Sequence, residues 1–251
     1  MQESSPDYMF VVGLSQLVGE SMLSIPKIGC VGFHPTKLPE GRGRGAVAWL
    51  ILDKAPGAAT FFLMGEGMDD APILAQKEFE VNEDDYAQDV IDKIVDKIGG
   101  CLDTLLPQLK CGEVKPVKQD HSQATYLGKR NPEDGWIDWE KSSGEIVRLI
   151  RAVSTPLPGA YCSYQGKKII IDKATVGCNL KHIGVTGRVL KIDPSKGVLV
   201  QAGDGWVWLN RFRRINIDEF KIGSKIGSKT DYKFENLNRE VEILNKRLED
   251  E

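Results

Sequence analysis

The sequence lacks the features that mark several classes of protein. Its longest uninterrupted apolar run, residues 46–52, is far shorter than the roughly 20 residues that span a bilayer. Its five cysteines are odd in number and include no Cys-x-x-Cys pair, so neither a disulfide framework nor a zinc site of paired cysteines is indicated. The first residues include Glu3 and Asp7, whereas a signal peptide begins with basic residues. We therefore expect a cytoplasmic protein that has no transmembrane helix, no disulfide and no bound metal.

The composition is otherwise that of an ordinary globular chain. Of 251 residues, 41% are apolar and 27% are charged, which allows one large domain or two average ones. The formal net charge of −3 argues against a protein built mainly to coat nucleic acid. Charge is uneven, however, because residues 180–228 carry nine lysines and arginines against four acids. This stretch is a candidate surface for an anionic partner.

Short apolar segments alternate with helical ones in the first part of the chain. Residues 8–12, 30–33 and 58–64 predict strands, and the segment 46–52 predicts a helix. The continuous apolar character of 8–12 is typical of a strand buried in a parallel sheet. Over residues 84–106 apolar side chains recur every three or four positions, which predicts a long helix. Its expected inner face consists of Val90, Ile91, Ile94, Val95, Ile98, Leu102 and Leu105.

The pattern changes after residue 141. Ser142 and Glu145 have the spacing of a capping box, which predicts a helix that ends before Pro156. Short strands separated by turn residues then predict a small antiparallel module, closed into a barrel. Their expected ranges are 160–164, 168–171, 187–192, 198–202 and 207–209.

The last segment, 234–251, predicts an amphipathic helix. Its apolar stripe consists of Phe234, Leu237, Val241, Leu244 and Leu248. Because the stripe is too short to predict a coiled coil, we expect the helix to fold back on its own domain, with a homodimer seam as the alternative.

Residues suited to chemistry follow two of the predicted strands. His34 comes directly after the strand 30–33, at the position where α/β sheets bind ligands. The acidic segment Glu66-Gly67-Met68-Asp69-Asp70 follows the strand 58–64. Taken alone, His34 is equally typical of a solvated loop, and the acidic segment of an ordinary turn. His121 and His182 have no partners at metal-ligand spacing and are expected at the surface.

Several segments, in order along the chain, resemble the folate-dependent formyltransferases, the family of methionyl-tRNA and amino-sugar formyltransferases. They are His34-Pro35-Thr36-Lys37-Leu38-Pro39, Arg42-Gly43-Arg44, Thr60-Phe61-Phe62-Leu63-Met64 with the acidic segment after it, and Asn131-Pro132-Glu133-Asp134-Gly135-Trp136. The resemblance implies an α/β fold. Its parts are a partial doubly wound, Rossmann-like sheet, a C-terminal OB-like β-barrel and a terminal helix.

The same resemblance implies a division into four parts. Residues 1–115 would form the catalytic domain, 116–158 a linker and helix, 159–228 the OB-like domain and 229–251 the last helix. Relative to the family, the chain begins at the fourth strand of the sheet, so about the first third of the catalytic domain is expected to be absent. This leaves open a fragment, a remnant completed by another chain, or a protein that has lost catalysis.

The activity that the resemblance implies is transfer of a formyl group from N10-formyltetrahydrofolate to a primary amine, without a metal. His34 matches the family histidine that stabilises an oxyanion or relays a proton. Asp69 matches the aspartate that orients this histidine and helps to take the proton of the amine. The formyl donor is expected against two segments, which consist of Gly13, Leu14, Ser15, Gln16 and Leu17 and of Thr36, Lys37, Leu38 and Pro39.

One position departs from the family. Gly32 stands where the family has asparagine, so a side-chain donor is missing. Loss of an oxyanion donor typically lowers the rate by about 10²–10³. A non-catalytic protein that binds folate or RNA is therefore the alternative to an enzyme.

Two acceptors are expected from the resemblance. The loop with Arg42 and Arg44 favours an amino-sugar nucleotide. The basic stretch 180–228, with Trp206 and Trp208, favours the methionyl group of initiator tRNA. Both acceptors remain open at this point.

Overall fold

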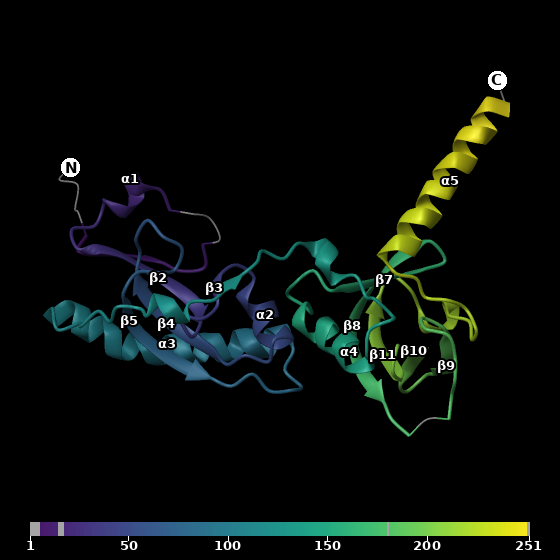
Figure 1. Cartoon of the computed structure of the whole chain (residues 1–251), viewed down its shortest axis with the longest axis horizontal. Helices are drawn as coiled ribbons and strands as arrows, with labels where there is room; N and C mark the ends of the chain where they lie inside the picture. Colours follow the sequence, from purple (N-terminus) through teal and green to yellow (C-terminus); the bar gives the residue numbers. More distant parts are fainter. Residues whose placement is uncertain (1–5, 15–17, 180, 250–251) are drawn as a thin grey trace. The chain divides into compact units, whose positions relative to one another are not determined.

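The structure is a computed structural model that describes residues 6–14, 18–179 and 181–249. The chain divides into two compact units, residues 1–130 and 131–251 (Figure 1). Within the described ranges, no helix combines the length and the apolarity that a bilayer crossing needs. The cysteines are all free.

The first unit contains a four-stranded mixed sheet. Its strand order is β1-β2-β4-β5, formed by β1 (Tyr8–Val11), β2 (Gly29–Thr36), β4 (Gly57–Leu63) and β5 (Ile73–Phe79). The three predicted strands are confirmed with shifted ends, whereas β5 was not predicted. Only β1 and β2 are parallel, because β4 and β5 each run antiparallel to the preceding strand. The sheet of this unit is therefore mixed rather than doubly wound and parallel.

The apolar run of β1 favours a buried strand, whereas the expected absence of the family's first strands leaves it at an exposed edge of the sheet, and the structure agrees with the second expectation. It lies at the edge of the sheet, with β2 as its one neighbouring strand among the described residues. Its side chains are half-buried or exposed, and Phe10 keeps 38% of its surface accessible although its ring packs edge-on against Phe61. An apolar run is thus enough to form the strand, but burial also requires a second neighbour.

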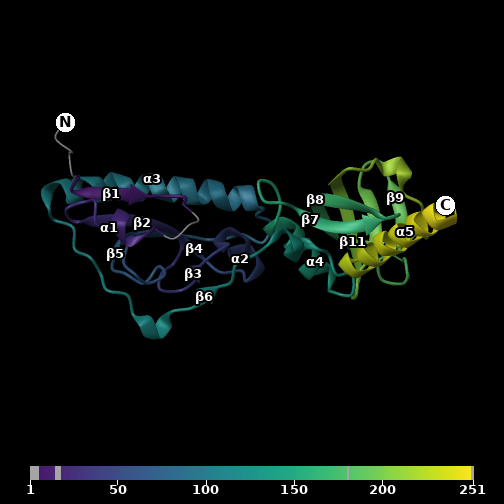
Figure 2. The same ribbon diagram turned by 90° about the horizontal axis from the view of Figure 1, so that it is seen from above.

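Two helices accompany this sheet. The helix α2 (Ala46–Leu52) has the predicted bounds, and the long helix α3 (Ala87–Cys111) begins and ends later than predicted. Figure 2 shows α3 running alongside the strands of its unit. Cys101 and Leu105 of α3 form the buried core together with Val31, Ala59 and Phe61 of the sheet. The core therefore lies between α3 and one face of the sheet.

Val95 was predicted on the inner face of α3, and this prediction is wrong. Its side chain is 61% exposed, whereas Val90, Ile94 and Leu105 are buried. Val95 follows Ile94 directly, and successive helical residues are rotated by about 100°, so Val95 turns out of the core.

The second unit contains helix α4 (Ser143–Ala152) and an antiparallel sheet. Ser142 and Glu145 form the predicted capping box at the start of α4. The five strands have the order β7-β8-β11-β10-β9, and their bounds are β7 (Ala160–Tyr164), β8 (Lys167–Gly177), β9 (Val189–Asp193), β10 (Gly197–Gln201) and β11 (Trp206–Arg213). All five predicted strands are present, and β8 and β11 are longer than expected.

The expected closed barrel is not formed by these strands. The strand order leaves β7 and β9 as the two edges of the sheet. The irregular segment 223–227 bonds to both edges, because Ser163 of β7 donates its N–H to Gly227 and Val189 of β9 donates its N–H to Ser224. This segment forms only isolated bridges, since it contains two glycines and one of them, Gly223, has a φ of 83°.

The terminal helix α5 (Lys229–Glu249) does not fold back on its domain, contrary to the prediction. Its first turn packs, with the Tyr232 ring 5.3 Å from the ring of Trp136. Beyond that turn the described side chains of the apolar stripe, Phe234, Leu237, Val241 and Leu244, are exposed, and Phe234 keeps 64% of its surface accessible. Figure 1 shows α5 leaving the second unit from the end near β7. The helix forms as predicted, but these four side chains have no cover among the described residues.

The core of the first unit generates a stability prediction. Leu105→Ala removes a fully buried side chain between α3 and the sheet, so it should lower the free energy of unfolding by about 2–5 kcal/mol. Val95→Ala on the same helix should change it by less than about 0.5 kcal/mol. The measurement is the midpoint of urea unfolding followed by circular dichroism. Equal shifts for the two variants would contradict this placement of the core.

Candidate active site

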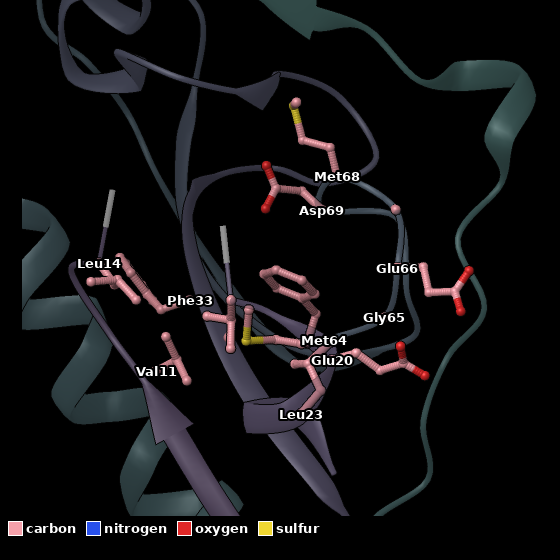
Figure 3. Close-up of a pocket in the computed structure, with 14 residues that line it drawn as sticks. Val11, Leu14, Glu20, Leu23, Phe33, Met64, Gly65, Glu66, Met68 and Asp69 are labelled. Carbon is pink, nitrogen blue, oxygen red and sulfur yellow. The ribbon is translucent and has the colours of Figure 1, made fainter. Parts of the chain in front are cut away.

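A pocket of about 350 Å³ lies in the first unit, and Figure 3 shows its lining. The end of β1, the short helix α1 (Glu20–Leu23), strand β2 and the loop after β4 form its walls. The apolar lining consists of Val11, Leu14, Val18, Leu23, Phe33, Phe62, Met64 and Met68. Glu20, Glu66 and Asp69 contribute three carboxylates, and no lysine, arginine or histidine is among the described lining residues. The pocket thus suits a flat, largely apolar ligand that carries N–H donors.

His34 and Asp69 lie together at this pocket. The Nδ1 atom of His34 is 3.6 Å from Oδ2 of Asp69, although the two residues are on different elements. The Nε2 atom of His34 is 2.8 Å from the carbonyl oxygen of Gly41. A carbonyl oxygen only accepts, so Nε2 carries a hydrogen and the neutral ring has its lone pair on Nδ1. The geometry therefore makes Nδ1 the atom that exchanges a proton, next to a carboxylate.

Asp69 is the member of the pair that reaches the pocket. Its carboxylate lines the pocket and also accepts the backbone N–H of Gly43, at 2.9 Å. His34 is buried behind it in β2, with 8% of its side chain accessible. His34 therefore acts on the pocket through Asp69. Asp69 has a φ of 52°, a left-handed conformation that is uncommon outside glycine.

The first predicted donor-binding segment meets the pocket in part. Leu14 lines the pocket, and Gly13 next to it has a φ of 74°. Ser15, Gln16 and Leu17 lie outside the described residues. Of this segment, Leu14 therefore reaches the pocket from the end of β1.

The second predicted donor-binding segment lies elsewhere. Thr36 and Lys37 line a separate cavity of about 110 Å³, and none of Thr36, Lys37, Leu38 and Pro39 lines the pocket that contains Asp69. The Thr36 hydroxyl donates to the carbonyl of Glu40 at 2.8 Å, and Lys37 pairs with Glu78 at 3.0 Å. Leu38 is buried. Thr36, Lys37 and Leu38 therefore contact other residues of the first unit and not the pocket that contains Asp69.

Arg42 was expected in an open loop, where it could meet phosphate, and the structure contradicts this. Its side chain is 1% exposed and bonds to Gln119, Tyr126 and His121, so it points into the protein. Arg44, by contrast, is exposed. The prediction from sequence missed Gln119, because a single glutamine in a segment without periodicity gives no signal of a site.

Gly32 is buried in β2, at the wall of the pocket. A Cβ atom at this position would lie 2.9 Å from the Cγ atom of Met64 and 2.9 Å from the Cζ atom of Phe62. Real Cβ atoms do not approach other atoms so closely without a shift. Apolar side chains thus fill the space that an asparagine side chain at position 32 would need.

No metal centre is visible at this site. Among the described residues, no three histidine, cysteine, aspartate or glutamate side chains are grouped so that they could hold a metal ion.

Comparisons of sequence connect both units to one family. Residues 1–102 match the family described as formyl transferase, and residues 129–225 match the formyl transferase C-terminal domain. The chain is 32% identical over 238 residues to a methionyl-tRNA formyltransferase of Halothermothrix orenii, a match that covers 90% of this chain and 74% of that protein.

Comparisons of structure give the same fold at lower identity. HypX from Aquifex aeolicus, solved with tetrahydrofolic acid, is similar with a TM-score of 0.69 and 22% identity. The match covers 84% of this chain, which spans only 36% of the HypX chain. An N-formyltransferase from Helicobacter canadensis, solved with folinic acid and dTDP-3-aminofucose, has a TM-score of 0.56 and 20% identity over 72% of this chain and 65% of its own.

The packing around Gly32 predicts that alanine destabilises the protein at position 32 and stabilises it at Gly99, an open position on α3. Gly32→Ala overpacks the wall against Phe62 and Met64, so it should lower the free energy of unfolding by about 1–3 kcal/mol. Gly99→Ala on α3 meets no atom within 4 Å and should raise it by about 0.5–1 kcal/mol, since alanine favours a helix. Urea unfolding of both variants measures the difference. A stabilised Gly32→Ala protein would mean that the wall has free space.

Proposed function

Because this chain belongs to the formyl transferase family, we propose that it transfers the formyl group of N10-formyltetrahydrofolate to a primary amine. The observation that carries this proposal is the contact between His34 and Asp69 at the edge of the pocket. It brings together a proton-exchanging nitrogen and a carboxylate where a bound ligand would meet them.

The pocket fits the pterin end of a reduced folate. Its volume lies within the range of about 300–1,000 Å³ that is usual for small-molecule sites. Leu14, Phe33 and Met64 supply apolar surface for a flat ring, and Glu20 and Glu66 supply acceptors for its N–H groups. When bound, the donor supplies the formyl carbon that the amine attacks.

Asp69 and His34 would accept and transfer the proton of the amine. As the new C–N bond forms, the bond between the formyl carbon and N10 of the donor breaks. The amine loses a proton and N10 takes one up as tetrahydrofolate leaves, so a group that accepts and returns a proton must stand beside them. Asp69 reaches the pocket and can accept this proton, and Nδ1 of His34 can share it across 3.6 Å. The ring then lies between the Asp69 carboxylate and the Gly41 carbonyl, each next to one of its nitrogens.

For the acceptor we favour an amine carried by tRNA. The nine lysines and arginines of residues 180–228 are all exposed in the second unit. They are Lys181, Arg188, Lys191, Lys196, Arg211, Arg213, Arg214, Lys221 and Lys225. A similar protein at 32% identity is a methionyl-tRNA formyltransferase. Trp208 is buried, so the support comes from charge and not from base stacking on that ring.

An amino-sugar nucleotide is the other acceptor. The argument for it from the Arg42-Gly43-Arg44 loop is weakened, because Arg42 is buried in contacts with Gln119, Tyr126 and His121.

A protein that binds folate without turnover is the second candidate function. The observation in its favour is Gly32, where Phe62 and Met64 fill the space of a side-chain donor. An assay for turnover separates this candidate from the enzyme.

The enzyme proposal predicts the effect of changing the proton-handling pair. His34→Ala and Asp69→Asn should each lower kcat/KM by about 10²–10⁴, because each removes a group that exchanges the proton of the amine. The assay is release of tetrahydrofolate from formyltetrahydrofolate in the presence of amine acceptors. Asp103→Asn, an exposed carboxylate on α3, is the matched control and should keep wild-type activity. Equal release by wild type and His34→Ala would reject catalysis and leave the binding protein.

The tRNA acceptor predicts binding that depends steeply on salt. Affinity for charged initiator tRNA in filter binding should fall by at least about tenfold between 50 and 200 mM salt, since neutralised phosphates release counterions. Lys196→Ala with Arg211→Ala should weaken binding at low salt and make the salt dependence shallower. If the wild-type protein had no affinity even at low salt, the tRNA acceptor would be rejected and the amino-sugar nucleotide retained.

A further inference from the structure

The buried side chain of Gln119 connects two parts of the first unit. Its Oε1 atom accepts from Nε and Nη2 of Arg42, at 3.2 and 2.7 Å. Its Nε2 atom donates to the backbone carbonyls of Asp69 and Ala71, at 2.8 and 2.7 Å. Arginine only donates and carbonyls only accept, so the orientation of the amide is determined. Both donors and both acceptor positions of Gln119 are in use.

Arg42 fixes the oxygen end of this amide. It is 1% exposed, and its remaining bonds go to the Tyr126 hydroxyl at 3.2 Å and to Nδ1 of His121 at 3.3 Å. Among the described residues it has no ion pair with a carboxylate. Burial of a charge is costly unless it is hydrogen-bonded. Loss of a neutral acceptor would therefore be unfavourable, and this keeps the acceptors in contact with the guanidinium. Gln119 is the acceptor that it contacts twice.

The nitrogen end of the amide holds the turn that carries Asp69. The left-handed backbone of Asp69 is uncommon for a residue with a Cβ atom, so contacts that hold the turn matter. Gln119 supports the Asp69 carbonyl from one side. Gly43, next to Arg42, supports the carboxylate from the other side through its N–H.

The segment that contains Gln119 is itself tied to the sheet. Val117 and Ile73 exchange two backbone hydrogen bonds of 2.8 Å, and β6 (Tyr126–Leu127) pairs with β3 (Arg42–Gly43). Backbone pairing on both sides of Gln119 therefore keeps its amide in register with the Asp69 turn.

We propose that Gln119 is a positioning residue that holds the Asp69 carboxylate between His34 and the pocket, with Arg42 as its anchor. This inference rests on the proposed function for its consequence in catalysis. The alternative is that Gln119 only stabilises the fold, in which case the environment of His34 would not depend on it.

Gln119→Glu is the variant that tests this. A glutamate keeps both acceptors for Arg42, now as an ion pair, but it cannot donate to the carbonyls of Asp69 and Ala71. The protein should stay folded while the Asp69 turn relaxes. We expect kcat to fall by at least about tenfold and KM for formyltetrahydrofolate to change less than threefold, because the donor walls are untouched.

The spectroscopic readout is independent of activity. His34→Ala assigns the ring ¹⁵N resonances of His34 among the three histidines of the chain. Asp69→Asn then shows how they move when the carboxylate is lost. Gln119→Glu should move them in the same direction as Asp69→Asn. Gln123→Glu, the same change at an exposed glutamine of the same segment, should leave them in place.

The outcomes separate the inference from the proposed function. Unchanged His34 resonances in folded Gln119→Glu would overturn the positioning role, whatever the activity. The His34 resonances could shift in Gln119→Glu while the wild-type protein transfers no formyl group. That result would support the positioning role and reject the proposed function. If Gln119→Glu does not fold by circular dichroism, Gln119→Asn is measured in its place. Its amide is one methylene too short to reach both partners, so the same His34 shift is expected.

Discussion

The imidazole of His34 stands between two acceptors, and the arrangement of the site depends on this contact. One acceptor is the Gly41 carbonyl and the other is the Asp69 carboxylate. To place them, the chain must bring a strand, the loop after it and a left-handed turn to one point. Each of these is stabilised elsewhere: the strand by the sheet, the loop by pairing of β3 with β6, and the turn by the amide of Gln119. The contact between His34 and Asp69 thus depends on packing between segments that are far apart in the sequence.

Local patterns in the sequence predicted most elements but not their neighbours. The periodicity of α3, the capping box at Ser142 and the five strands of the second unit were all predicted, because each depends on residues close in sequence. Strand β5 was missed, since Gln76, Lys77 and Glu78 interrupt its apolar character. The closure of the barrel and the packing of α5 were predicted wrongly, because each depends on a distant segment.

The candidate site was predictable to a similar extent. His34 and Asp69 were chosen from the resemblance to a family, and the structure brings them into contact. The expected role of Thr36–Pro39 came from the resemblance and that of Arg42 from its position in a loop, and neither determines the direction of a side chain. Gln119 had no signal at all, because its importance comes from four hydrogen bonds to residues about 50 and 77 positions away.

The location of Gln119 has a consequence for dissecting the molecule. A shortened polypeptide that stopped at residue 115 would retain the histidine, the aspartate and every described lining residue of the pocket. It would nevertheless lose Gln119, whose amide oxygen is a neutral acceptor for the buried Arg42 guanidinium. Residues 116–130 thus belong to the first unit, so a fragment that keeps every contact of Arg42 must extend through β6.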